Sequence, residues 1–92
     1  MSENDDTEQR GFTFPGIFEV TAMGEAVPEL EAIVMSALVA TGCKPDPGSA
    51  RHRSSSGGKY LSVSLSFECD TRERYEAAHA RLRAHPAVLW TL

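Results

Sequence analysis

Ten consecutive residues, YLSVSLSFEC at positions 60–69, alternate between two kinds of side chain without a break. The odd positions hold leucine, valine, phenylalanine and cysteine, and most even positions hold serine. Because a β-strand turns successive side chains to opposite faces, this period of two predicts a strand in a sheet with one buried face. The other face carries a row of hydroxyls and is expected to stay open to solvent or to a partner.

The stretch at 17–22 alternates in the same way and predicts a second central strand. Residues 28–41 place apolar side chains at helical spacing, which predicts a helix with one apolar stripe. Pro28 suits the first turn of this helix, where its missing N–H is not needed, and Gly42 suits the C-terminal cap.

A second helix is predicted directly after the serine-rich strand. Asp70 is expected to be its N-cap, and Glu73 three residues later completes a capping box. His85 and Pro86 end the helix, since the residue before a proline disfavours the helical conformation. The inner stripe of this helix consists of Tyr75, Ala78, His79 and Leu82.

Shorter segments join these elements. Lys44–Gly48 contains two prolines and is expected to be a connector, whereas residues 49–53 are expected to form a charged edge strand. Ser54–Gly58 is expected to be a hairpin turn. The aromatic residues between positions 12 and 15 are expected to pack on the edge of the domain.

The C-terminal residues 87–92 predict a last short strand with Val88, Trp90 and Leu92 on one face. We expect Trp90 to lie at the sheet, partly buried against the second helix or the first strand. The alternative is a dimer contact, since tryptophan on an edge strand is a good interface anchor.

The order strand, helix, strand, strand, helix, strand predicts an α+β fold, the ferredoxin-like βαββαβ sandwich. Its four-stranded antiparallel sheet would carry both helices on one face, with the strands at 17–22 and 60–69 in the centre. The charged segment and the C-terminal segment would form the two edges. This single domain is expected to span residues 12–92, after a disordered acidic tail at 1–11.

Composition excludes several classes of function. The chain has 92 residues and a formal net charge of −4, and four of its thirteen acids lie in the tail. A nearly neutral folded part with serines on its open face argues against nucleic-acid binding, which needs a basic surface or exposed aromatics. No apolar run reaches the length of a membrane span, and the polar N-terminus is unlike a secretory signal, so the protein is expected to be cytoplasmic.

Motifs for catalysis or for cofactors are missing. The two cysteines form no CxxC pair and the histidines have no HxH or HxxxH spacing, so neither a metal site nor a redox motif is expected. The run Ser56–Lys59 lacks the glycine and the following Ser or Thr of a phosphate-binding loop. With no G-x-S-x-G elbow either, we expect no catalytic residues, no cofactor and no enzyme activity.

Three stretches resemble a known family. Phe14-Pro15 leads into the strand ending at Gly24, and the run Met23–Leu30 is similar to the pattern Met-Gly-x-Ala-x-Pro-Glu-Leu. Residues 54–64, SSSGGKYLSVS, are similar to a serine/glycine turn followed by Tyr-x-Ser-Val-Ser. The chain thereby resembles the YbeD-like proteins, small uncharacterised bacterial proteins with an ACT-like ferredoxin sandwich.

The resemblance implies a regulatory type of module without an established activity. ACT-like modules bind amino acids or other small metabolites, usually at a subunit interface near the loop after the first strand. In this chain that loop is Met23, Gly24, Glu25 and Ala26, which implies a small-molecule effector and a homodimer. Gly24 would let the backbone approach the ligand; alternatively, Gly24 only makes the turn from strand to helix.

A second hypothesis is a protein-interaction or self-assembly module that uses the open sheet face or an edge strand. The only basic cluster, made by Arg51, Arg53 and Lys59 together with His52, would hold an anionic metabolite or an acidic segment of a protein partner. Alternatively, these charges only protect an edge strand from pairing.

Overall fold

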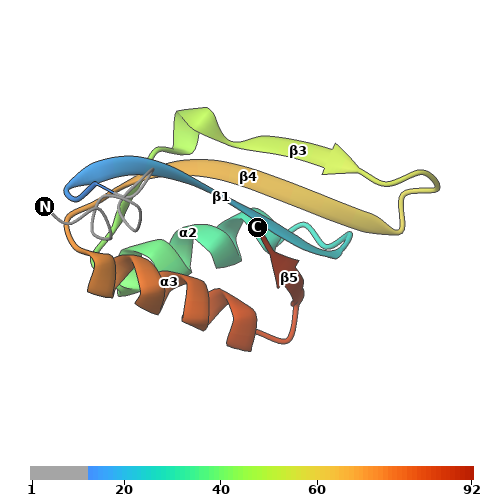
Figure 1. Ribbon diagram of the computed structural model, residues 1–92. Helices are drawn as coiled ribbons and strands as arrows, with labels where there is room; N and C mark the ends of the chain where they lie inside the picture. The colour runs from blue at the N-terminus through green and yellow to red at the C-terminus, as the bar shows by residue number, and fades with distance from the viewer. Residues whose placement is uncertain (1–12) are drawn as a thin grey trace, which may run out of the picture.

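Two long antiparallel strands, β1 (Gly16–Glu25) and β4 (Tyr60–Cys69), form the centre of the sheet in the computed structural model, which describes residues 13–92 (Figure 1). Their pairing runs over ten residues of each strand, from Gly16 opposite Cys69 to Glu25 opposite Tyr60. The strand predicted from the serine alternation therefore has the predicted bounds. The predicted acidic tail at 1–11 lies outside the described residues.

The edges of the sheet also follow the prediction, with one addition. β3 (Arg51–Ser54) pairs with β4, and β5 (Val88–Thr91) pairs with β1 on the other side. A further two-residue strand, β2 (Lys44–Pro45), precedes the 3₁₀ turn η1 (Pro47–Ser49) and also pairs with β4. The predicted connector is thus partly strand, and β2 and β3 form one interrupted edge.

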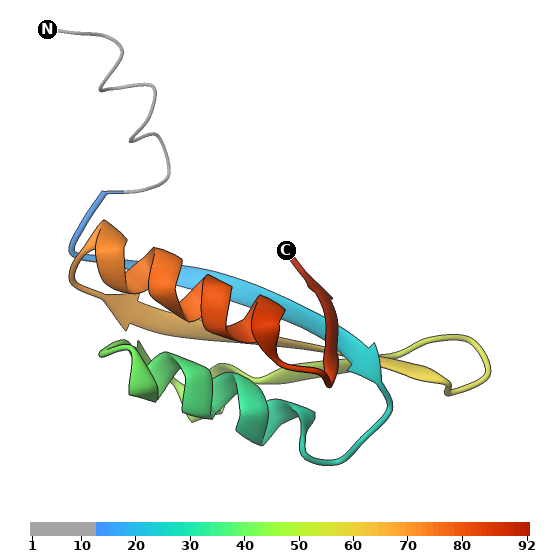
Figure 2. The same cartoon turned by 90° about the horizontal axis from the view of Figure 1, so that it is seen from below.

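Helices α2 (Leu30–Ala40) and α3 (Arg72–Ala84) lie side by side on one face of the sheet (Figures 1 and 2). No other element described in residues 13–92 covers the opposite face. The predicted ferredoxin-like sandwich is confirmed. Its core lies between the helices and the sheet, and its fully buried large side chains are Val20, Leu30, Val34, Leu38, Val63, Leu65, Phe67, Cys69 and Leu82.

An aromatic cluster closes one end of this core. Phe14 packs 4.9 Å from Phe18 and 5.9 Å from Tyr75, measured between ring centroids, and Phe67 lies 6.0 Å from both Phe18 and Tyr75. The predicted aromatic lead-in therefore does pack on the edge of the domain, as far as Phe14 is concerned. Phe12 lies outside the described residues.

The end of α2 follows the sequence, and its start differs slightly. Gly42 has a φ of +90°, a conformation that favours glycine, and its N–H donates to the carbonyl of Val39 while the N–H of Cys43 donates to that of Leu38. These two bonds satisfy carbonyls that a helix end leaves unpaired. Pro28 lies in the turn before the helix rather than in its first turn.

The predicted cap of α3 is wrong by one residue. Thr71 is the N-cap, and its hydroxyl accepts a hydrogen bond of 3.2 Å from the N–H of Arg74. Cys69 is still paired with β1, so Asp70 makes the turn out of the sheet, and its carboxylate lies 3.4 Å from the Arg74 guanidinium. No capping box forms, because the third residue after Thr71 is an arginine.

An irregularity in β5 overturns the predicted arrangement of the C-terminal side chains. Trp90 is opposite Met23 but Val88 is opposite Gly24, so Leu89 is an extra residue, as in a β-bulge. Val88 consequently faces the helices and is buried, whereas Trp90 turns to the open face and is 54% exposed. Of the two predicted neighbours of Trp90, the first strand is correct and the second helix is wrong.

Candidate binding surfaces

The open face of the sheet carries two rows of side chains, and each row runs across β3, β4, β1 and the C-terminal strand. Residues directly opposite one another in antiparallel strands point to the same face, so each row can be read from the pairing. One row is Arg51, Ser64, Thr21 and Leu92, and the next is Arg53, Ser62, Met23 and Trp90. Each row runs from an arginine at one edge of the sheet to a large apolar side chain at the other.

Hydroxyls bind one another in the middle of this face. The Oγ1 atom of Thr21 lies 2.8 Å from the Oγ atom of Ser64, within hydrogen-bond distance. The guanidinium of Arg51 forms an ion pair with Glu19, whereas Arg53 forms no ion pair within residues 13–92. A shallow hollow of about 640 Å³ extends over this region. The face thus offers an unpaired cation, a polar middle and an apolar edge, where Leu92 is 79% exposed.

The four residues of the predicted ligand loop do not converge. Met23 lies on the open face, opposite Trp90. The N–H of Ala26 donates to the carbonyl of Lys59 at 3.0 Å, which ties the loop to the turn of the β3–β4 hairpin. Glu25 lines a different hollow. The loop that the resemblance implied as a ligand site therefore does not present all four of its side chains to one surface.

Gly24 is buried against the chain itself. A Cβ atom at this position would lie 2.2 Å from the carbonyl oxygen of Ala87, far inside any normal contact. The missing side chain makes room for the connection between α3 and β5. The expected approach of a ligand to Gly24 stays a prediction; the group that lies close to Gly24 is the carbonyl of Ala87, so the glycine itself gives no support to a ligand site.

A hollow of about 370 Å³ does lie beside this loop. Glu25 at the end of β1 and Val27 in the following loop line one side, and residues 85–87 of the α3–β5 connection together with Leu89 of β5 line the other. It combines the exposed carboxylate of Glu25 with the imidazole of His85 and otherwise apolar walls. Leu89, the extra residue of the irregular β5 register, thus contributes its side chain to this hollow.

The predicted basic cluster is divided between surfaces. Arg51 and Arg53 share the open face, but His52 points to the opposite side, where its Nε2 atom lies 2.8 Å from a carboxylate oxygen of Glu31 on α2. The ammonium of Lys59 lies 5.6 Å from the ring centre of Tyr60. Lys59 does not line the hollow of the open face.

Sequence reasoning missed Trp90 on the open face. The expectation of no nucleic-acid binding rested partly on a sheet face without aromatics in its middle strands, and the bulge places an indole beside Met23 on this face. The remaining support for that expectation is the low positive charge. No composition signal marks Leu89 as the extra residue.

Buried titratable groups lie in the core rather than at these surfaces. The thiols of Cys43 and Cys69 lie 3.3 Å apart, and burial, with a further effect of the adjacent Cys69, raises the pKa of Cys43 to about 11. Burial lowers the pKa of His79, whose Nε2 atom has no hydrogen-bond partner among the described residues. Within residues 13–92, no three His, Cys, Asp or Glu side chains are grouped to hold a metal ion.

Comparisons with known proteins agree with this architecture. A family model described as "Protein of unknown function (DUF493)" matches residues 9–92. The chain is 46% identical over 92 residues to a UPF0250 protein of Xanthomonas campestris and 42% identical to one of Xylella fastidiosa, with both chains fully covered in each case. These matches bear out the resemblance to YbeD-like proteins.

A solved structure resembles the fold at low sequence identity. The ACT domain from the GTP pyrophosphokinase of Chlorobium tepidum matches with a TM-score of 0.63 and 8% identity, covering 83% of this chain and 94% of that domain. The ACT-like fold is therefore shown. In the described part of the chain, neither helix is long and apolar enough to cross a membrane.

Proposed function

The chain thus belongs to the DUF493 family, and since the description of that family assigns no activity, we propose a function from the geometry: a non-catalytic interaction module whose open sheet face binds the same face of a second copy. The two rows on that face carry the proposal. In both rows the arginine and the large apolar side chain stand at opposite edges of the sheet.

A two-fold axis between two such faces, parallel to the strands, would reverse the order of the strand positions. Arg53 of one copy would then lie over Trp90 of the other, and Arg51 over Leu92. A guanidinium over an indole is attractive, and the symmetry repeats each contact twice. The hydroxyls of Thr21 would meet those of Ser64 in the middle.

The size of the face limits the strength of this dimer. The strands β1 to β5 hold 10, 2, 4, 10 and 4 residues, 30 in all, and roughly 3.4 Å of length and about 4.8 Å of width for each residue give a flat area on the order of 500 Å². A standard protein interface buries about 800 Å² on each partner. We therefore expect a reversible dimer whose population depends on protein concentration.

Sedimentation and tryptophan fluorescence test this proposal together, because Trp90 is the only tryptophan of the chain. The weight-average mass should rise with concentration, and the emission of Trp90 should shift to shorter wavelength over the same range. Arg53→Glu and Trp90→Ala should each abolish both changes. Arg83→Glu makes the same change of charge on α3 and should leave them intact. A wild-type protein that stays monomeric at millimolar concentration would refute the proposal.

The hollow beside the first loop favours a second candidate, an amino-acid-sized effector. Glu25 would bind a ligand ammonium group, and Val27 and Leu89 would contact its apolar part. A ligand that binds only the folded state raises the melting temperature. A panel of amino acids should therefore contain one that stabilises the wild type and the Glu29→Gln control, but not Glu25→Gln. No stabilisation by any member, or an equal effect on Glu25→Gln, would contradict this site.

A further inference from the structure

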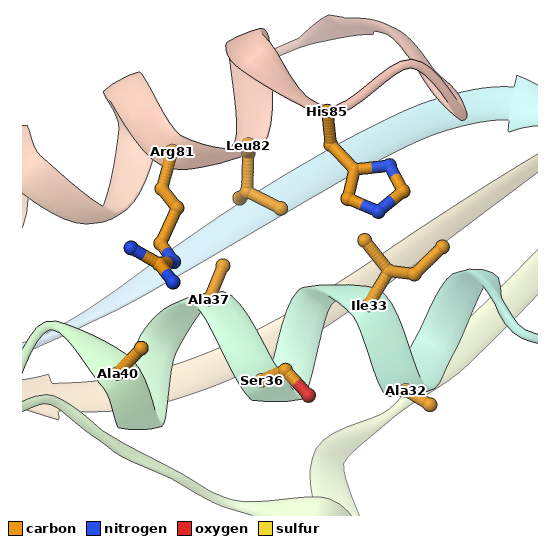
Figure 3. Close-up of a pocket in the computed structure, with 8 residues that line it drawn as sticks. All are labelled: Ala32, Ile33, Ser36, Ala37, Ala40, Arg81, Leu82 and His85. Carbon is orange, nitrogen blue, oxygen red and sulfur yellow. The ribbon is translucent and has the colours of Figure 1, made fainter.

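A groove lies between the two helices, on the side of the domain opposite the open sheet face. Figure 3 looks into this groove with the strands behind it. Its volume is about 350 Å³, at the lower end of the range for small-molecule sites. It is lined by Ala32, Ile33, Ser36, Ala37, Ala40, Arg81, Leu82 and His85.

The sequence of α2 explains why the groove is open. Ala32, Ser36 and Ala40 are spaced four residues apart, so they share one side of the helix and present only small groups there. Ala37 and Leu82 are buried beneath them and form an apolar floor. A larger residue at any of the three small positions would fill the space.

Two hydrogen-bond donors face this apolar floor, Arg81 from the last turn of α3 and His85 from the C-cap that follows it. Arg81 and His85 are also four residues apart, which puts both on the side of α3 that looks across to α2 (Figure 3). The guanidinium of Arg81 reaches toward α2 beside Ala37. Within residues 13–92 Arg81 forms no ion pair, so its charge is uncompensated.

The hydrogen bonding of His85 makes its other nitrogen a donor. The Nδ1 atom accepts a hydrogen bond of 3.1 Å from the N–H of Ala87. A neutral imidazole that accepts at Nδ1 carries its proton at Nε2. The imidazole hangs over the groove toward Ile33 in Figure 3, so this N–H is available to a ligand.

We propose that the interhelical groove binds a small organic carboxylate with a short apolar body. The two carboxylate oxygens would accept hydrogen bonds from Arg81 and from Nε2–H of His85, a charge-assisted arrangement. The apolar body would lie on Ala37 and Leu82. Inorganic phosphate would leave that floor uncovered, and a neutral amide would leave the arginine charge without a partner.

Amide NMR titration with isovalerate tests this proposal on the intact chain. Shifts should saturate at Ser36, Ala40 and His85 and should stay small on the open sheet face. Isovaleramide and inorganic phosphate should each bind at least about tenfold more weakly, the loss expected when a charged hydrogen bond or the apolar contact is missing. Arg81→Gln should weaken isovalerate binding by a similar factor, whereas Arg83→Gln, a neighbouring arginine outside the groove, should not.

Every alternative outcome overturns the site. Equal binding of isovaleramide would show that the charge of Arg81 does not contribute to binding. Equal binding of phosphate would show that the apolar floor of Ala37 and Leu82 does not contribute. No saturable shift with isovalerate up to tens of millimolar, or unchanged binding in Arg81→Gln, would also refute the proposal. Because Arg81 is exposed, the variant is expected to fold, and its own spectrum checks this. The dimer proposal is independent, since it uses the other side of the sheet.

Discussion

Replacement of Gly24 by alanine should destabilise the domain through a single contact. The added Cβ atom would lie 2.2 Å from the carbonyl oxygen of Ala87, whereas real Cβ contacts below 3.0 Å are essentially never seen. The α3–β5 connection must therefore move by close to 1 Å. Gly24 does not have a positive φ, so the effect is steric and not conformational.

The cost follows from the nature of the clash. The contacting atom is backbone, which cannot rotate away, and Gly24 is buried beside the side chain of Leu30. Overpacking of a well-packed core typically costs about 1–3 kcal/mol. In a domain of this size each kcal/mol lowers the melting temperature by about 4–8 °C. Movement of Ala87 should also loosen β5 and thereby change the emission of Trp90.

Urea unfolding followed by circular dichroism measures this effect. With a slope of about 1 kcal/mol per molar urea, the midpoint for Gly24→Ala should fall by about 1–3 M with an unchanged slope. Gly48→Ala is the matched control, because its Cβ atom would meet only Asp46 Oδ1 at 3.4 Å, and it should stay within about 0.5 kcal/mol of the wild type. Equal midpoints for Gly24→Ala and the wild type would refute the packing argument.

Three further predictions concern stability and reactivity. Thr71→Ala should lower the free energy of unfolding in urea by about 0.5–2 kcal/mol, because it removes the N-cap of α3, and Asp70→Ala should lower it by less. The reverse order would show that Asp70 is the N-cap, as the sequence predicted. Because burial lowers the pKa of His79 in the folded state, the unfolded state binds more protons below about pH 6.5, and the free energy of unfolding should fall as the pH drops below that value. The variant His79→Leu should make this fall less steep. An unchanged pH dependence in the variant would contradict the assignment to His79. Cys43 and Cys69 should react with a thiol reagent at pH 8 only as fast as the domain opens, whereas two rapid equivalents in the native protein would show that the thiols are accessible.

Local pattern was sufficient for the main elements. The alternation at 60–69 depends only on the period of a strand, and β4 follows it because the odd residues from Val63 to Cys69 are buried under the helices and Leu61 is partly buried. The end of α2 is equally local, since Gly42 can adopt a positive φ without a Cβ penalty. The start of α3 was harder, because Asp70 and Thr71 are both good N-caps and the pairing of Cys69 with β1 selects between them.

The binding surfaces needed the register of the sheet. The same sequence, Val88–Leu92, would place Trp90 under the helices or on the open face according to one extra residue, and that residue is fixed by how β5 meets β1. Likewise, the interhelical groove exists only because residues of α2 and α3 that are more than forty positions apart face each other. Periodicity along the chain thus determined which elements form and which of their sides is apolar. The packing of distant segments alone decided which side chains meet. The partners of a side chain depend on the register between strands and on the way the helices cross, and the spacing of residues along the chain encodes neither.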